Sequence, residues 1–559
     1  MDISSEDEAL AHGGRSLVQQ LEAQGVSTIF TVPGESFLAA LDGFHEADGI
    51  QTIICRQEGG AAMMAEAWGK FTGRPGICFV TRGPGAANAM SGLHVAQQDS
   101  TPMVLFLGMP ASDHEDREAF QEVDVGGLFG TFVKWAAVIR DSKRIPEYVS
   151  RAFHVAQSGR PGPVVLGLPE DMLAGASGTD VVAPAARPAA AAPQPTAMRE
   201  LQTRLSSAER PLIVVGGPGW SVETRDRLQD FAARTQIPVA SAFRCQDYVD
   251  NRHQNYVGCV GIGVEPELAD AVRSADVLLT IGARFGEMTS SGYTLLDIPQ
   301  PKQTLVHVHP DPSELGTVYR SDIPIAASAD EFVSALSELD VQARTGAAEQ
   351  VQRLRDVFLA SLEPLGVPGD VKLDQVIAKL SDLLPDDAVI CNGAGNYAAF
   401  LHRYYAYKGW RTQLAPTSGS MGYGLPAAIA AKIAAPDRPV IALAGDGCFM
   451  MTCQELATAA QYGANVVTIV VNNGIYGTIR MHQERDYPKR VIATELKNPD
   501  FAAFAQCFGA HGETVTRTED FGAALDRALS ANAPAIIELK TDPEAISPKQ
   551  TISGLRSRA

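Results

Sequence analysis

The stretch LAGDGCFM, Leu443 to Met450, ends a run of aliphatic residues and places the carboxylate of Asp446 between two glycines. The run that it ends, PVIALAG, is typical of a strand buried on both faces of a parallel sheet. A second aliphatic run, VVTIVV, follows a helical segment and stops at Asn472, Asn473 and Gly474. Because one helix joins the two strands, a right-handed crossover brings Asp446 and Asn473 to the same edge of the sheet. Ligands of open α/β sheets bind at that carboxyl edge.

The side chains at this edge suit a magnesium-bound diphosphate. Mg²⁺ takes a few hard oxygen ligands from the protein when phosphate oxygens and water fill its other positions. The helix predicted after Gly447 directs backbone N–H groups toward an anion, and Thr452 and Glu455 have the spacing of a capping box in that segment. For a single aspartate, capping a helix is the alternative. Two strand ends that both carry oxygen ligands favour the diphosphate site.

Similar aliphatic runs recur along the whole chain, each ending near glycine or proline and separated by amphipathic helical patterns. A Pro/Ala stretch at 183–197 cannot form a compact core and is typical of a linker. The predicted organisation is therefore a segment 1–182, the linker 183–197, segments 198–340 and 355–540, and a C-terminal tail 541–559. This pattern predicts an α/β fold with three consecutive doubly wound parallel-sheet domains.

The bulk composition argues against several classes of function. The 559 residues carry a formal net charge of −19, which disfavours binding to nucleic acid or to anionic membranes. The acidic N-terminus lacks an apolar signal core, and no apolar run has the length of a membrane span. Eight cysteines without a CxxC pair favour free thiols in a reducing compartment over disulfides or a zinc site. We therefore expect a soluble, cytoplasmic protein.

The first segment carries a candidate acid at the end of a strand-like run. Glu58 follows a strand-like run, QTIICR, and precedes Gly59, Gly60 and a series of apolar residues. Apolar surroundings suit a carboxyl group that exchanges its proton with a weak base near neutral pH. A glutamate that only interacts with the dipole of a helix N-terminus is the alternative.

Together these motifs resemble those of thiamine diphosphate-dependent enzymes. The GDG and NNG motifs around Asp446 and Asn473 resemble the diphosphate-binding motif of these enzymes. The stretch CRQEGGAAMMAEAWGK resembles the glutamate motif of the group that contains acetolactate synthase, pyruvate oxidase and benzaldehyde lyase, with Gln57 and Trp68 as departures. VTRGPGAANAMSGL, EAFQE and SGSMGYGLPAA resemble further motifs of this group. The overall pattern is most similar to the acetolactate synthase large subunit.

The resemblance implies roles for individual residues. Asp446, the Asn473 side chain and the Ile475 carbonyl would hold Mg²⁺, Met421 would bend the cofactor, and Glu58 would hydrogen-bond its pyrimidine so that C2 of the thiazolium ionises. The implied cofactor-binding residues are Glu58, Gly393, Ala394, Gly395, Asn396, Gly419, Met421, Asp446, Gly447, Cys448, Asn473, Ile475, Tyr476 and Gly477. The implied catalytic residues are Glu58, Phe120, Gln121 and Lys134; a surface glutamine and a solvated lysine are the alternatives for the last two.

The middle segment carries a weaker nucleotide signal. The run PLIVVGGPGW lacks the third glycine of a dinucleotide fingerprint. GARF and HPDPSELG resemble the flavin-contacting segments of acetolactate synthases, which implies non-redox FAD. ADP, or a domain that has lost its nucleotide, is the alternative. The candidate FAD-binding residues are Gly216, Gly217, Gly219, Gly282, Ala283, Arg284 and Asp311.

The resemblance implies a non-oxidative decarboxylase and carboligase that acts on a 2-ketoacid such as pyruvate and forms a C–C bond through a hydroxyalkyl-thiamine enamine. The biosynthetic enzymes carry an arginine for the acceptor ketoacid where this chain has Met288, and a tryptophan where it has His482. An aldehyde or ketone acceptor is therefore expected rather than a second ketoacid. Cleavage without ligation, as in a 2-ketoacid decarboxylase or a 2-hydroxyacyl-CoA lyase, and a flavin-linked pyruvate oxidase-like reaction are the alternatives. Glu35 is either a second acid at the substrate or a helix cap.

The family also places its activating glutamate and its diphosphate site on different subunits. By this resemblance, Glu58 of one chain meets Asp446 of its partner. The active unit implied is at least a homodimer, and the expected assembly is a homotetramer built as a dimer of dimers.

Overall fold

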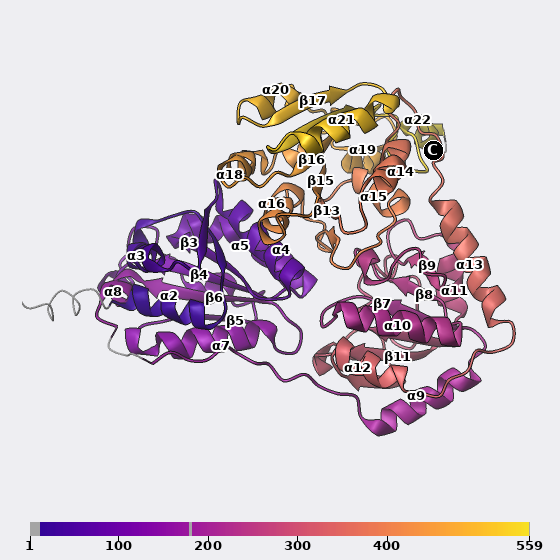
Figure 1. The fold of residues 1–559 in the computed structure, drawn as a ribbon, viewed down its shortest axis with the longest axis horizontal. Coiled ribbons are helices and arrows are strands. Elements are labelled where there is room, and N and C mark those ends of the chain that lie inside the picture. Colours follow the sequence, from indigo (N-terminus) through magenta and orange to yellow (C-terminus); the bar gives the residue numbers. More distant parts are fainter. Residues whose placement is uncertain (1–11, 178–180, 558–559) are drawn as a thin grey trace, which may run out of the picture. The chain divides into compact units, whose positions relative to one another are not determined.

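The computed structural model describes residues 12–177 and 181–557, and it contains three six-stranded sheets in which all neighbouring strands are parallel (Figure 1). The prediction of three consecutive α/β domains with doubly wound parallel sheets is confirmed. The strands of the first sheet are β1 (Thr28–Thr31), β2 (Gln51–Ile54), β3 (Gly76–Thr81), β4 (Met103–Met109), β5 (Trp135–Val138) and β6 (Pro163–Pro169). Those of the second are β7 (Pro211–Val215), β8 (Val239–Ser241), β9 (Tyr256–Cys259), β10 (Val277–Ile281), β11 (Thr304–His309) and β12 (Ile323–Ala326). Those of the third are β13 (Val389–Asn392), β14 (Gln413–Leu414), β15 (Val440–Gly445), β16 (Val467–Asn472), β17 (His511–Val515) and β18 (Ala535–Lys540).

The order of the strands defines where each sheet can bind a ligand. The first sheet has the order β2-β1-β3-β4-β6-β5 and the third has the equivalent order β14-β13-β15-β16-β18-β17, whereas the second is β12-β11-β10-β7-β8-β9. The chain reverses its direction of winding between β1 and β3, between β7 and β10, and between β13 and β15. The loops at the carboxyl ends of these strand pairs form the crevice in which open α/β sheets bind their ligands.

Burial explains why the longer aliphatic runs form strands. Every residue of β4 and β6 is buried, and β10 is buried throughout as well. Strands covered on both faces need continuous apolar sequence, and this is the pattern that the runs provide. The edge strand β14, with two residues, lacks that signal and was not predicted.

Helices alternate with the strands in each segment (Figure 1). In the first segment they are α2 (Gly13–Ala23), η1 (Glu35–Phe37), α3 (Leu38–Glu46), α4 (Glu58–Thr72), α5 (Arg82–Asp99), η2 (Ser112–His114), α6 (Val125–Phe129), η3 (Ser142–Arg144), α7 (Ile145–Gln157) and α8 (Glu170–Ala174). In the second they are α9 (Pro195–Ser207), α10 (Val222–Thr235), η4 (Gln246–Tyr248), α11 (Pro266–Ser274), η5 (Pro312–Glu314), α12 (Ala329–Ser337) and α13 (Ala347–Ser361). In the third they are α14 (Leu373–Leu383), α15 (Tyr397–Tyr404), α16 (Gly424–Ala434), α17 (Asp446–Phe449), η6 (Cys453–Glu455), α18 (Leu456–Gln461), α19 (Gly477–Asp486), α20 (Phe501–Gln506), η7 (Thr518–Asp520), α21 (Phe521–Ser530) and α22 (Ile552–Ser557).

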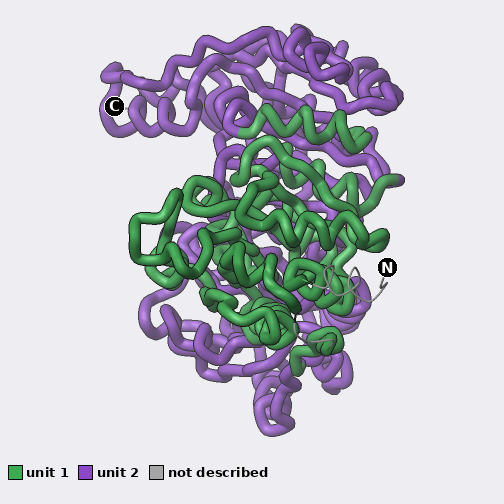
Figure 2. Tube along the Cα trace, turned by 90° about the vertical axis from the view of Figure 1, so that its left-hand side faces the viewer, with its two compact units in different colours: residues 1–189, 425–436, 452–465 green, residues 190–424, 437–451, 466–559 purple. Residues whose placement is uncertain are grey.

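Contacts divide the chain into two compact units, which differ from the three predicted segments (Figure 2). Unit 1 comprises residues 1–189, 425–436 and 452–465, and unit 2 comprises the rest. Most of α16 and all of α18 therefore belong to unit 1, although they follow strands of the third sheet in sequence. The Pro/Ala linker 183–197 is extended up to α9, and the Gln20 side chain donates to the carbonyl of Ala183 and accepts from its N–H, both at 2.8 Å.

Two expectations about the whole chain can be compared with the described residues. None of the eight cysteines, all of which lie within the described residues, forms a disulfide. Within residues 12–177 and 181–557, no helix has the length and apolar character needed to cross a membrane.

Candidate functional site

Asp446 occupies the turn between β15 and α17 in unit 2, and its carboxylate is held by backbone and side-chain donors. The residue is 3% exposed. One carboxylate oxygen accepts from the N–H of Gly447 at 2.8 Å, and the other accepts from the N–H of Gly474 at 2.9 Å and from Nδ2 of Asn498 at 2.8 Å. Burial raises the pKa of the carboxyl, while these hydrogen bonds lower it. The contact with Gly474 brings the ends of β15 and β16 together, as the crossover argument predicts.

The β16 side of this turn adds amide and carbonyl oxygens. Asn473 Oδ1 accepts from the N–H of Ile475 at 3.1 Å, and the Tyr476 N–H donates to Thr494 O at 2.8 Å. Asn498 was missed by the sequence reasoning: its Nδ2 donates to Asp446 and, at 3.0 Å, to Oδ1 of Asn472. It lies in an irregular segment before α20, where no strand end or glycine motif marks it.

Glycines allow close packing in the loops that carry these oxygens. A Cβ on Gly447 would lie 2.5 Å from the Tyr476 ring, and one on Gly393 would lie 2.6 Å from Sγ of Cys448. Gly474 adopts a left-handed φ of +69°, and Gly419 one of +70°. These glycines let the loops of the third sheet approach their neighbours closely.

The remaining predicted residues of this half also lie in unit 2. Asn396 Nδ2 donates to the Ile546 carbonyl at 2.8 Å, and its Oδ1 accepts from Thr478 at 2.9 Å. The Tyr397 hydroxyl donates to Cys448 Sγ at 3.1 Å, which fixes the loop after β13 against α17. Met421 is partly buried against the apolar core of the third sheet. Gly395 has a φ of +144°, and Ala394 stands between it and Gly393; Gly477 begins α19.

This donor set fits a magnesium ion that shares its coordination with a diphosphate. It consists of one carboxylate (Asp446), one side-chain amide (Asn473) and one carbonyl (Ile475), all hard oxygens. Among the described residues no group of three or more His, Cys, Asp or Glu could hold a metal, so an all-protein cage is not present there. One protein carboxylate together with substrate phosphates is the pattern that Mg²⁺ uses.

Glu58 begins α4 in unit 1, directly after the end of β2. Its carboxylate is half-buried and accepts from Nδ2 of Asn88 at 2.9 Å. The N-cap is Gln57, whose side chain accepts from the N–H of Gly60 at 3.1 Å, and Gly73 ends the helix in the left-handed conformation. Asn88 lies on α5, which packs closely on α4 because both helices present glycine and alanine.

Gln121 and Phe120 lie at the same carboxyl edge as Glu58. The Gln121 carbonyl accepts from the N–H of Gly83 at 2.8 Å, and a Cβ on Gly85 would lie 3.6 Å from Glu58 Oε1. Phe120 is 70% exposed, which is unusual for so large an apolar side chain. The structure therefore brings Glu58, Phe120 and Gln121 to one edge of the first sheet.

Arg82, which the sequence reasoning did not single out, joins two acids at this edge. Its guanidinium contacts Glu35 Oε1 at 3.2 Å and donates to Glu170 Oε2 at 3.0 Å, and it lies 5.8 Å from the centre of the Phe120 ring. Arg82 is 8% exposed, whereas the Glu35 side chain is 68% exposed. Glu35 begins η1 without a side-chain capping bond, so the cap that the sequence left open is not formed.

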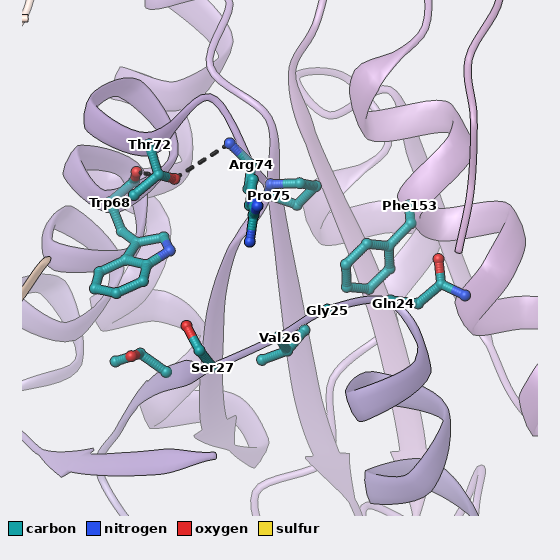
Figure 3. A pocket seen from close by; sticks show the side chains of 10 residues that line it. Gln24, Gly25, Val26, Ser27, Trp68, Thr72, Arg74, Pro75 and Phe153 are labelled. Atoms are coloured by element: carbon teal, nitrogen blue, oxygen red, sulfur yellow. Dashed lines mark hydrogen bonds between the residues drawn. The ribbon is translucent and has the colours of Figure 1, made fainter. Parts of the chain in front are cut away.

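Lys134 is not brought to this edge. It precedes β5, at the amino ends of the strands, where its N–H donates to Pro163 O at 2.8 Å. Its ammonium group donates to the carbonyl of Ser158 at 2.6 Å, just after α7. At the same amino-end side, Figure 3 shows a pocket whose walls include Trp68, Arg74 and Phe153, distant in the sheet from Glu58.

Glycines of the central sheet pack on each other. Gly217 and Gly282 have left-handed φ of +68° and +75°, and a Cβ on either would overlap the backbone of the loop that carries the other. The carbonyl of Gly216 accepts from Trp220 Nε1 at 3.0 Å, and that of Gly217 accepts from the Tyr248 hydroxyl at 2.7 Å. These glycines are thus explained by loop packing alone and carry no argument for FAD. Gly219 is also left-handed, Asp311 caps η5, and Ala283 and Arg284 follow Gly282 after β10.

One correction concerns the segment after Asp446. The capping box predicted for Thr452 and Glu455 does not form, because the Thr452 side chain makes no capping bond and Cys453–Glu455 is a turn of 3-10 helix. Glu455 instead points to the beginning of α4, where Oε1 accepts from the N–H of Arg56 at 3.1 Å. Spacing alone cannot distinguish a local cap from a contact with a distant segment.

Three α/β domains with a glycine-lined oxygen cluster on the third sheet and a strand-end glutamate on the first define a class of cofactor-dependent enzymes. The chain belongs to the thiamine pyrophosphate enzyme family. Residues 11–128 match the N-terminal thiamine pyrophosphate-binding domain of that family, 198–336 its central domain and 393–539 its C-terminal thiamine pyrophosphate-binding domain.

Curated relatives narrow the similarity within the family. The chain is 32% identical to the acetolactate synthase large subunit of Parasynechococcus marenigrum (strain WH8102), over 94% of this chain and 87% of the relative. It is 30% identical to the acetolactate synthase isozyme 2 large subunit of Escherichia coli (strain K12), over 95% and 96% of the two chains. The protein is thus a thiamine diphosphate-dependent enzyme that resembles acetolactate synthase.

Proposed function

We propose that the protein is a Mg²⁺-dependent decarboxylase and carboligase that takes a 2-ketoacid donor and joins it to a neutral acceptor. The observation that carries this proposal is the pair of carboxylates at strand ends: Asp446, fixed by three N–H donors, and Glu58, half-buried with one side-chain partner. Thiamine diphosphate, when bound, supplies an electron sink for loss of CO₂. Every other part of the chemistry is assigned to residues of this chain.

We assign the residues of unit 2 to binding the metal ion and the diphosphate. Asp446, Asn473 Oδ1 and the Ile475 carbonyl would hold Mg²⁺, and backbone N–H groups at the start of α19 would face the diphosphate. Because the three hydrogen bonds to Asp446 orient its oxygens before any ligand arrives, little reorganisation is needed on binding. The role is positional, so the carboxylate need not change its protonation state.

We assign Glu58 in unit 1 to proton transfer. Glu58 can hold or release a proton at Oε1, while Asn88 keeps Oε2 in place by donating to it at 2.9 Å. Gln121 would orient the donor substrate from the loop after β4, where its carbonyl bond to Gly83 supports this placement. Lys134 is left out of the proposed site because it lies among the amino ends of the strands.

A neutral acceptor is supported by the charges beside Glu58. Arg82 is shared by two carboxylates, so the cluster Glu35–Arg82–Glu170 carries one negative charge in excess. The exposed carboxylate of Glu35 disfavours a second ketoacid, whose charge it would repel. Met288 replaces the arginine with which similar enzymes hold an acceptor carboxylate, which points in the same direction.

A panel of 2-ketoacids, tested with and without aldehydes and ketones in the presence of Mg²⁺ and thiamine diphosphate, tests the proposal by product identification. Ligation products with a neutral acceptor are expected. Free aldehyde alone would favour a decarboxylase, dependence on CoA thioesters would favour a 2-hydroxyacyl-CoA lyase, and dye reduction would favour a flavin-linked oxidase. The visible absorbance spectrum of the purified protein reports whether FAD is bound, which we do not require for the reaction.

We also propose that two chains share each site, with Glu58 and Asp446 contributed by different subunits of a homodimer or of a homotetramer. Mixing Glu58→Gln and Asp446→Ala proteins after reversible dissociation tests this arrangement. Hybrids would regain activity because one of their two sites receives both native residues. Hybrids that form, as shown by mass spectrometry, and yet remain inactive would contradict the shared site.

A further inference from the structure

Glu455 is a buried acid that the reaction as described so far does not use. It is 0% exposed and ends η6, in the short segment 452–465 that packs within unit 1. A buried ionised carboxylate is costly unless donors surround it, so its partners indicate what it stabilises.

The donors around Glu455 belong to the turn that leads into α4. The N–H of Arg56 lies 3.1 Å from Oε1 and 3.2 Å from Oε2, and the Thr458 hydroxyl donates to Oε2 at 2.7 Å. The backbone N–H of Gln57 also interacts with the carboxylate. These N–H groups directly precede Glu58, and groups at a helix start have no partner within their own helix.

Gly60 confirms how closely the two segments pack. A Cβ at this position would lie 2.5 Å from Glu455 Oε1 and 2.8 Å from its Cδ. Because Gly60 has no Cβ, it leaves room for the carboxylate of Glu455. The same face of the segment binds the end of β2, since the Ile54 N–H donates to the Tyr462 hydroxyl at 2.8 Å and Arg56 donates to Gln461 at 2.6 Å.

We propose that Glu455 is a positioning residue that fixes the backbone before Glu58 and so sets where the Glu58 carboxylate lies. This inference rests on the proposed function of Glu58. The contacts reach the two residues that precede Glu58 and the one two positions after it, but none reaches the Glu58 carboxylate, so that group stays available for proton transfer. A small displacement of a reacting group costs a large factor in rate, about 10²-fold for an error of about 1 Å.

The test measures C2–H/D exchange of thiamine diphosphate bound to the Mg²⁺-loaded full-length protein. Glu455→Gln keeps the volume but places an NH₂ group among N–H donors, so exchange should slow by about 10- to 100-fold. The dissociation constant of thiamine diphosphate should change less than about threefold, because the diphosphate is held by Asp446 and Asn473 rather than by α4. Glu66→Gln is the matched control: Glu66, on α4, is also fully buried and accepts from the Thr101 hydroxyl at 2.6 Å and pairs with Lys70 at 3.3 Å, and its substitution should leave exchange near the wild-type rate.

A double-mutant cycle separates positioning from general stability. If Glu455 acts through Glu58, adding Glu455→Gln to Glu58→Gln should slow exchange no further, because the group being positioned is already inactive. An equal loss in both backgrounds, or wild-type exchange in the folded Glu455→Gln protein, would overturn the inference. If Glu455→Gln does not fold, Thr458→Val removes one donor to the same carboxylate and is judged by the same two criteria. Wild-type protein that fails to accelerate exchange would instead contradict the proposed role of Glu58 itself.

Discussion

The first and third sheets have the same strand order, yet they present their key carboxylates in opposite ways. Asp446 follows the third strand of its sheet, is 3% exposed and receives donors on both oxygens from Gly447, Gly474 and Asn498. Glu58 follows β2, the edge strand of its sheet, is half-buried and accepts from a single side chain, Asn88. Similar topology therefore holds one acid with three donors and leaves the other with a single side-chain donor.

The groups that hold the two acids in place also differ. The donors to Asp446 reach its carboxylate directly, whereas the buried acid near Glu58, Glu455, reaches only the backbone beside it. A carboxylate that is held in place by hydrogen bonds and keeps a lone pair on one oxygen, as Asp446 does on Oδ1, is suited to bind a metal, while a carboxylate with few hydrogen-bond partners is suited to general acid–base work. The predictions below test this division, beginning with the largest effect.

Asp446→Ala should abolish activity, since it removes the only carboxylate of the proposed magnesium site and leaves the diphosphate charge uncompensated. Asn473→Ala should reduce activity and be partly rescued by excess Mg²⁺, because one neutral ligand is lost. Activity of both variants is measured over a Mg²⁺ titration, with far-UV circular dichroism as the check on folding. Full activity of Asp446→Ala at ordinary cofactor concentration would contradict the anchoring role.

Glu58→Gln should separate proton transfer from binding. General acid–base assistance typically contributes about 10²- to 10⁴-fold, so C2–H/D exchange should fall by about that factor. Cofactor affinity should change much less, since one neutral hydrogen bond is worth about 1 kcal/mol. Quenched NMR measures the exchange and calorimetry the affinity. Unchanged exchange would remove Glu58 from the mechanism and leave it as a helix-start charge.

Much of this comparison could be predicted from the sequence. The long aliphatic runs identified β15 and β16, and the crossover rule placed Asp446 beside the Asn473 turn. Glu58 was singled out because the stretch around it resembles the glutamate motif of the family and follows a strand-like run. The two strands and the turns that follow them could be predicted because each is encoded by residues that are close together in the sequence.

Two contacts at the site could not be predicted because their partners lie far apart in the sequence. Asn498 is 52 residues from Asp446 along the chain, and Glu455 is 399 from Arg56, so no local pattern pairs them. Lys134 was placed by resemblance alone, and its position before rather than after a strand puts it at the other edge of the sheet. The division into two units likewise depends on helix packing that periodicity does not encode.

The charge of Glu35 should affect acceptor choice more modestly. Pyruvate should be a poor acceptor for the wild-type protein, and Glu35→Gln should raise kcat/KM for a ketoacid acceptor by about fivefold, as expected for about 1 kcal/mol between unit charges at about 4 Å in water. Competition between pyruvate and a neutral aldehyde measures the shift. Glu147→Gln, which removes a surface acid paired with Arg144, is the control and should leave the product ratio unchanged. Efficient acetolactate formation by the wild type would contradict a neutral acceptor.

The smallest expected effect is the pH dependence of stability at Glu455. Burial, the largest influence, raises the pKa of this carboxyl above its ordinary value of 4.5, and hydrogen bonds from Thr458 and Arg56 oppose it. The folded protein then holds a proton on Glu455 at a pH where the unfolded chain has lost it, so this group stabilises the fold below its ordinary pKa and loses that contribution as pH rises through the raised value. The Tm of wild type minus the Tm of Glu455→Gln should therefore decrease as pH rises through this window. The pKa of Glu147 is lowered by its hydrogen bond with Arg144. The Tm of wild type minus the Tm of Glu147→Gln should therefore increase weakly as pH rises. Differential scanning calorimetry over an acidic pH series measures both slopes, and parallel curves for wild type and Glu455→Gln would show that Glu455 does not titrate in this range.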